Sequence, residues 1–238
     1  MMGDALAVLA FDTATAATVV GFSVGGELIC ELADRPTSDE RPRHAERLLS
    51  LCEQALAEAS IGWEEVDLIG VGVGPGTFTG LRIGAATAQG LAQANGAELV
   101  AVSTLEALAL AARVAEPELQ VAAVGDARRG EAFIAAWAPD GEQVVADQAC
   151  PPPQLVAALA ADGARSIAVG DGALIFRKEL ESGGITVPAD GSVLHQLGGA
   201  ALCQLATSGN PATAGALVPH YVRQPDAEIS LQARTESQ

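Results

Sequence analysis

Residues 68–84 have the sequence LIGVGVGPGTFTGLRIG, and this stretch decides the fold class. The apolar run 68–73 predicts a buried strand. The turn Gly74-Pro75-Gly76 then leads into a helix over about residues 80–94. A buried strand that passes through a glycine turn into a helix is the unit from which α/β folds are built.

The rest of the chain extends this pattern in two similar halves. Apolar periodicity predicts strands at 5–11, 17–24, 27–32 and 99–102, and helices at 45–59 and 105–114. The second half is expected to contain strands at 121–125, 132–137, 143–147 and 167–169, with helices at 155–161, 174–180 and 193–206. This repeated βββαβαβα order predicts an α/β protein with mixed sheets flanked by helices.

Composition limits the classes of function. The chain has 238 residues, 49% hydrophobic but only 3% aromatic, so its core is built from small side chains. Its net charge of −17 repels phosphate backbones, which excludes a protein that grips nucleic acid by itself. No apolar stretch is long enough to span a membrane, and the N-terminus lacks the basic flank of a signal peptide. We therefore expect a cytoplasmic protein.

Cysteines and histidines do not predict a metal site. Cys30, Cys52, Cys150 and Cys203 are scattered without a CxxC pair and are expected to be free thiols. The position four residues after His44 is Leu48, so no HxxxH pair exists. We therefore expect no bound metal.

Polar residues follow the first and fourth predicted strands. Asp12 ends the first strand, and Thr13 follows it. The Asp12 carboxylate either binds a metal ion that is linked to a phosphate or only caps its own turn. Gly74, Gly76, Thr77 and Thr79 precede a helix start, which favours anions. The glycine spacing fits neither a Walker A loop nor a dinucleotide fingerprint, and the threonines have the alternative role of helix caps.

The helix after this loop carries small residues four apart, at Gly80, Gly84, Ala88 and Ala92. Such a row lets another helix approach closely, and the neighbour is either part of the same chain or a partner protein. We prefer the interface, formed with the helix at 45–59. Arg82 lies in the first turn, where a cation opposes the helix dipole, so it is expected to meet a carboxylate or phosphate.

One turn, Asp126–Glu131, concentrates basic charge in Arg128 and Arg129. We interpret it as a hairpin tip, and the alternative is a phosphate-facing patch.

Five strings together resemble the TsaB (YeaZ) family, the glycoprotease-like proteins needed to make threonylcarbamoyladenosine in tRNA. They are FDTAT at 11–15, HAERLL at 44–49, GPGTFTGLRIG at 74–84, VSTL at 102–105 and DARRGE at 126–131. The resemblance implies the two-lobed actin/hexokinase-like (ASKHA) fold. We place the first lobe at 1–104, the smaller second lobe at 105–225 and a mobile tail at 226–238. The last helix is expected to pack back on the first lobe.

The resemblance also implies a role. This role is a non-catalytic scaffold subunit that pairs with the catalytic paralogue TsaD and with the ATPase TsaE, and forms a homodimer when alone. That complex installs threonylcarbamoyl on adenosine 37 of ANN-decoding tRNAs, and tRNA is bound only through the complex. The family's pairing surface is built from the first two helices. We assign to it Leu48, Leu49, Cys52, Gly80, Arg82, Gly84, Ala88 and Ala92.

Two expectations concern small molecules. We expect no required cofactor, with weak or shared ATP or ADP binding near Asp12, Thr13, Gly74, Gly76, Thr77, Thr79 and Arg128. The alternative function is an ATP-dependent sugar-kinase-like phosphotransferase that uses Asp12 and the glycine loop.

Overall fold

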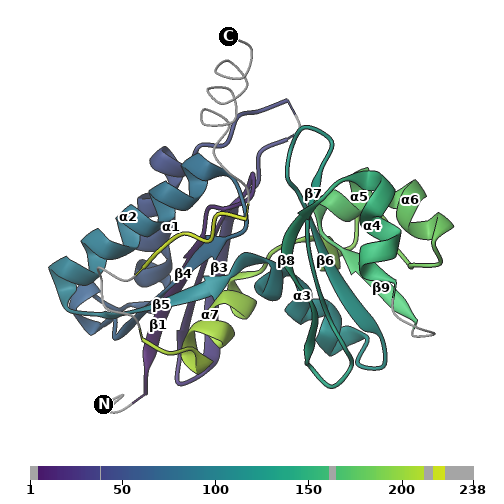
Figure 1. Ribbon diagram of the computed structural model, residues 1–238. Helices are drawn as coiled ribbons and strands as arrows, with labels where there is room; N and C mark the ends of the chain where they lie inside the picture. The colour runs from purple at the N-terminus through teal and green to yellow at the C-terminus, as the bar shows by residue number, and fades with distance from the viewer. Residues whose placement is uncertain (1–4, 38, 161–164, 212–216, 223–238) are drawn as a thin grey trace, which may run out of the picture.

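The computed structural model describes residues 5–37, 39–160, 165–211 and 217–222. These residues form two lobes that lie side by side, each built around one sheet (Figure 1). The N-terminal lobe carries the long helices, and the other lobe carries short ones.

The first lobe contains a five-stranded sheet in the order β3-β2-β1-β4-β5. Its strands are β1 (Ala7–Asp12), β2 (Thr18–Val24), β3 (Glu27–Asp34), β4 (Leu68–Gly74) and β5 (Glu98–Ser103). The first three strands are antiparallel, whereas β4 and β5 run parallel to β1. A short 3-10 turn, η1 (Trp63–Glu65), precedes β4.

Both faces of this sheet are covered by helices, which explains the continuous apolar run of β1. Leu9 and Phe11 face the helices α1 (His44–Ala59) and α2 (Phe78–Asn95). Val8 and Ala10 face the opposite way, toward α7 (Gly199–Ser208). A strand that is buried on both faces needs apolar residues at every position, not at alternate ones.

The second lobe repeats this plan with four strands in the order β8-β7-β6-β9. They are β6 (Gln120–Asp126), β7 (Ala132–Trp137), β8 (Gln143–Cys150) and β9 (Ser166–Val169). Again three antiparallel strands are followed by one parallel strand. One face packs on the short helices α4 (Pro152–Leu159), α5 (Asp171–Ile175) and α6 (Arg177–Ser182). Two lobes with this strand order form the actin/hexokinase-like fold that the sequence predicts.

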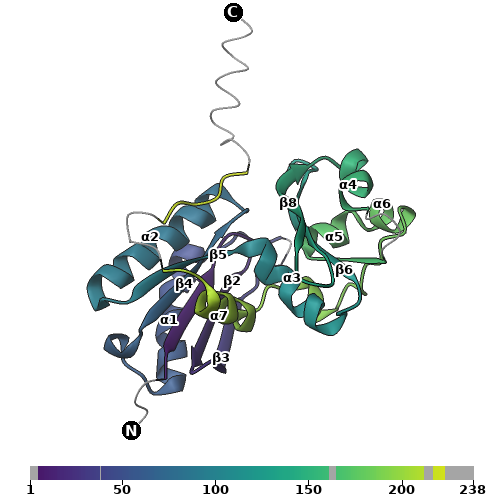
Figure 2. The ribbon, with the colours of Figure 1, turned by 60° about the horizontal axis from the view of Figure 1, so that its bottom comes forward.

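A single apolar cluster joins the lobes. The helix α3 (Thr104–Ala115) packs on β6 of the second lobe and also contacts α7, which lies on the first sheet (Figure 2). The cluster includes Val8 of β1 and Val121 of β6. The chain therefore crosses between lobes through a shared core.

Two predicted helices differ from the structure. The helix predicted at 193–206 is a 3-10 turn, η2 (Val193–His195), followed by α7, because Gly198 is extended and precedes α7 as its cap. The helix predicted at 174–180 is divided into α5 and α6 at Phe176, which has a non-helical backbone. The predicted tail, 226–238, and the end of the helix predicted at 155–161 lie outside the described residues.

In the described part of the chain, no helix combines the length and apolar character needed to cross a membrane.

Candidate functional site

Asp12, at the end of β1, is completely buried and fully engaged by its own chain. Its Oδ1 accepts a hydrogen bond from the Ala14 amide at 2.7 Å. Its Oδ2 accepts one from the Thr104 hydroxyl at 2.6 Å, and that hydroxyl also accepts the Gly74 amide at 3.2 Å. Any side chain at Gly72 would overlap the carboxylate. The carboxylate therefore caps its own turn and links β1, β4 and α3.

Burial raises the pKa of Asp12 above its ordinary value of 3.8, while the bonds from Thr104 and Ala14 act in the opposite direction. Because the folded state disfavours the charged form, the contribution of this group to stability is full below the ordinary pKa. It is lost as the pH rises through the raised pKa.

The neutral variant Asp12→Asn is therefore expected to become more stable relative to the native chain as the pH rises from about 4 to about 8. Urea unfolding of both proteins across that range measures the difference in unfolding free energy. A difference that does not change with pH would show that Asp12 has no raised pKa.

One pocket between the lobes, next to the turn after β1, has a volume of about 150 Å³. It is lined mainly by Thr15, Arg35, Thr104, Leu108, Asp171 and His195. Pockets that enclose a drug-sized ligand have volumes of roughly 300–1,000 Å³. This pocket is smaller than that range.

Two side chains hold the walls of this pocket in place. Arg35 donates a hydrogen bond to the Leu197 carbonyl at 2.8 Å, and burial lowers the pKa of its guanidinium although Glu31 acts in the opposite direction. His195 accepts the Gly170 amide on Nδ1 at 3.2 Å, and its Nε2 lies 3.1 Å from the Pro188 carbonyl. Nε2 therefore carries the proton, and neither ring nitrogen is left for a ligand.

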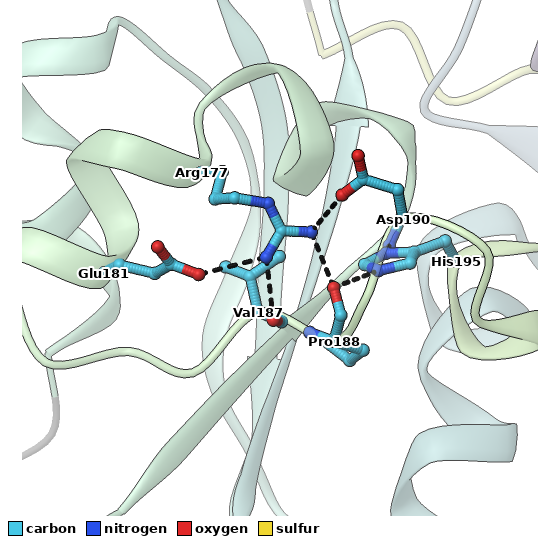
Figure 3. A network of polar contacts seen from close by, with 7 residues as sticks. Arg177, Glu181, Val187, Pro188, Asp190 and His195 are labelled. Atoms are coloured by element: carbon cyan, nitrogen blue, oxygen red, sulfur yellow. Dashed lines mark hydrogen bonds and ion pairs between the residues drawn. The ribbon is translucent and has the colours of Figure 1, made fainter.

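The loop that receives His195 is itself fixed by Arg177 of α6 (Figure 3). This guanidinium donates to the backbone carbonyls of Val187 and Pro188. It also forms ion pairs with the carboxylates of Glu181 and Asp190. The Pro188 carbonyl thus receives both Arg177 and His195, which orders this side of the pocket.

The row of small residues on α2 is buried by the chain itself, so its assignment to a partner interface is wrong. Gly80, Gly84, Ala88 and Ala92 are all buried. A side chain at Gly80 would overlap the Thr13 carbonyl oxygen, and one at Gly84 would lie 2.6 Å from Thr13 Oγ1. The Thr13 hydroxyl donates to the Gly80 carbonyl at 2.8 Å. Gly80 and Gly84 are small because the turn after β1 lies against them, whereas Ala88 and Ala92 pack in the core of the first lobe.

The residues of α1 that the sequence analysis assigned to the interface are partly buried and partly exposed. Leu48 and Cys52 are buried in the core of the first lobe, where burial raises the pKa of the Cys52 thiol to about 12. Leu49 remains 47% exposed. Arg82 is also exposed, where its guanidinium lies 3.8 Å from the centre of the Phe78 ring.

A second row of α2 faces outward, and the sequence analysis missed it. Arg82, Ala86, Gly90 and Ala94 are four apart and all exposed. Space around Gly90 is open, with no atom within 4 Å of an added Cβ. A glycine inside an exposed helix costs roughly 0.8–1 kcal/mol relative to alanine. In the sequence, a glycine inside a helix with no packing reason, Gly90, was the feature that could have indicated this exposed row.

Most of the remaining assigned residues lie where β4 leads into α2, and Arg128 lies in the other lobe. Thr77 and Thr79 begin α2 and line a pocket next to α1. Gly74 ends β4 with φ of 107°, and Gly76 packs on Ala14. Arg128 lies at the β6–β7 hairpin tip and pairs with Asp126 at 3.1 Å. The turn at Asp12 and Thr13 thus lies against Gly74 and the start of α2, since the Thr77 amide donates to the Ala14 carbonyl at 2.7 Å, whereas Arg128 belongs to the other lobe.

Among the described residues, no three His, Cys, Asp or Glu side chains are placed to hold one metal ion.

Comparison with known proteins places the chain in a family. Residues 37–176 match the family model of tRNA N6-adenosine threonylcarbamoyltransferase (TsaD). The chain is 34% identical over 178 residues to the tRNA threonylcarbamoyladenosine biosynthesis protein TsaB of Haemophilus influenzae, which covers 69% of this chain and 72% of that protein. It is 33% identical over 133 residues to the TsaB protein of Escherichia coli, covering 56% and 55%.

A solved structure agrees with the sequence relatives. YeaZ from Pseudomonas aeruginosa superposes with a TM-score of 0.72 at 29% identity, covering 91% of this chain and 99% of that one. Sequence identity to TsaB across most of the chain, and a shared fold over nearly all of it, lead to one conclusion. The chain belongs to the TsaB (YeaZ) family of tRNA threonylcarbamoyladenosine biosynthesis proteins.

Proposed function

We propose that this chain is a non-catalytic scaffold subunit of the complex that installs threonylcarbamoyl on adenosine 37 of ANN-decoding tRNAs. In this role it works in the cytoplasm, pairs with a TsaD-type transferase and is joined by a TsaE-type ATPase. When alone, it pairs with a second copy through the same surface.

The observation that carries this proposal is the outward face of α1 and α2, which we call the pairing face. It consists of the exposed residues Leu49, Arg82, Ala86, Gly90 and Ala94. Small side chains allow a partner helix to approach closely, and Leu49 adds apolar area. The two helices lie side by side on the outer face of the first sheet (Figure 1). A helix pair from a partner of similar fold fits such a surface.

The buried polar groups support a scaffold over an enzyme. Catalytic groups need a free atom within reach of the substrate. The Asp12 carboxylate is held by Ala14 and Thr104, and both ring nitrogens of His195 are bonded to the backbone. Asp12 and His195 thus use their polar atoms to hold the fold.

The negative charge of the chain supports the proposal that its partners, not this chain, bind the tRNA. At −17, this chain repels the tRNA backbone, so we assign tRNA binding to its partners. The acidic subunit then contributes by holding the transferase in an active arrangement.

The test is reconstitution with purified TsaD-type and TsaE-type proteins, tRNA and the threonylcarbamoyl donor. We expect tRNA modification only when this chain is present, and no turnover by this chain alone. Measuring molecular masses in mixtures with the TsaD-type protein should reveal a specific complex. Full modification without this chain, or modification by this chain alone, would contradict the proposal.

A further inference from the structure

The segment 217–222 lies on the first lobe beside α2 and passes the end of β4 (Figures 1 and 2). Leu217 is only 4% exposed and packs in the core of the first lobe, together with residues of α1, α2 and β4. The backbone amide of His220 donates to the carbonyl of Val73, in β4, at 2.7 Å. The first lobe therefore holds this segment by an apolar anchor and by a backbone hydrogen bond.

Tyr221 connects the segment to the start of α2. The centre of its ring lies 5.2 Å from that of Phe78, and its hydroxyl accepts a hydrogen bond from Nε of Arg82 at 3.4 Å. The guanidinium of Arg82 also lies 3.8 Å from the centre of the Phe78 ring. Two aromatic rings attract each other at such a distance, and so do a guanidinium and a ring face. Tyr221 thus holds in place a residue of the pairing face, Arg82.

His220 connects the same segment to the second lobe. Its Nδ1 lies 3.4 Å from Oδ2 of Asp147, in β8. The other oxygen of this carboxylate accepts a hydrogen bond from Gln143 at 3.0 Å. An imidazole N–H can donate to a carboxylate in the neutral ring as well as in the charged ring. Val222 packs on the apolar cluster that joins the lobes. The segment therefore contacts the core of the first lobe, the start of α2 and the second lobe.

The contacts after Leu217 are weak enough to open. The His220 side chain is 52% exposed and Tyr221 is 40% exposed. Exposed ion pairs contribute little to stability, and segments with few buried contacts open locally at a small cost in free energy. Because Leu217 is deeply buried, such an opening is confined to the residues that follow it. The segment thus has a docked state and a released state.

We propose that residues 217–222 form a strap that couples the second lobe to the start of α2, and through it to the pairing face. In the docked state, Asp147 holds His220, and the next residue holds Arg82. In the released state, Arg82 loses one of its two aromatic neighbours. Ordering a free side chain on binding reduces affinity, so a partner binds the docked state more tightly and in turn favours it. The effect on a partner rests on the proposed function, whereas the strap itself does not.

The first test uses the free full-length chain and the variant Asp147→Ala, which removes the strap's contact with β8. Hydrogen exchange followed by NMR should show the amide of His220 exchanging about twofold to fivefold faster, because one exposed ion pair has been lost. The amide signals of residues 78–82, in the other lobe, should shift. Glu142→Ala is the matched control, because it removes another exposed carboxylate beside β8, and it should change neither observation. Native exchange and native signals in Asp147→Ala would overturn the strap.

The second test measures the affinity for a purified TsaD-type protein. Asp147→Ala and His220→Ala should each lower the affinity about twofold to fivefold, although Asp147 lies in the lobe that does not carry the pairing face. The double variant should lower it no further, because both changes remove the same contact. Native affinity in the single variants, or losses that add in the double variant, would overturn the coupling to the pairing face. If the native chain forms no complex, the proposed function fails, and the exchange measurement still decides whether the strap joins the lobes.

Discussion

Replacing Gly80 with alanine is expected to destabilise the chain by more than about 3 kcal/mol, whereas the same change at Gly90 should stabilise it. Both glycines lie in α2, so helix propensity favours alanine at each by up to about 1 kcal/mol. At Gly80 the added methyl group would overlap the Thr13 carbonyl oxygen. At Gly90 it meets nothing within 4 Å.

The expected loss at Gly80 has a specific cause. The Thr13 hydroxyl is bonded to the Gly80 carbonyl, and Thr77 donates its amide to the Ala14 carbonyl at 2.7 Å. These contacts fix the turn after β1 against α2, so the backbone cannot move aside without breaking them. Urea unfolding followed by circular dichroism measures both variants. Equal stability of the two would show that α2 does not lie against this turn.

Gly90→Arg is expected to weaken pairing with the TsaD-type protein at least about 100-fold while the free chain keeps its stability. The long side chain projects from the centre of the pairing face, where we propose that a partner helix approaches closely. Because the space around Gly90 is open and arginine is a better helix former than glycine, folding should not suffer. Sedimentation velocity of the mixture, with thermal unfolding of the free variant, measures both effects.

Val114→Arg is the control for this experiment. Val114 is 74% exposed on α3, away from the pairing face, so a new arginine there should leave the affinity unchanged. Pairing of the Gly90→Arg variant at native affinity would exclude this face as the contact. The buried row that includes Gly84 is unsuitable for such a test, because its variants would disturb folding first.

The amino-acid sequence was sufficient for the order of strands and long helices. Apolar runs such as 68–73 and the glycine turn after them predict local structure directly, since each depends on residues close in the chain. The family also followed from contiguous strings. The weaker predictions concern the second lobe, where the break at Phe176 separates α5 from α6 in a short helical region.

Helical periodicity alone did not reveal which side of α2 is buried. It groups Gly80, Gly84, Ala88 and Ala92 on one side, and Arg82, Ala86, Gly90 and Ala94 on another. Both rows contain mostly small residues, so their hydrophobicity differs too little to separate them. The turn at Thr13, which lies against Gly80 and Gly84, and the core that encloses Ala88 and Ala92 decide that the second row faces outward.

The same reason applies to Asp12 and His44. Their positions at a strand end and a helix start are properties of the local sequence. Their partners Thr104 and Thr18 are 92 and 26 residues away, and only the folded chain brings them together. Local pattern thus determined the elements and the family of this protein. Contacts between distant segments decided which polar groups are enclosed and which face is open.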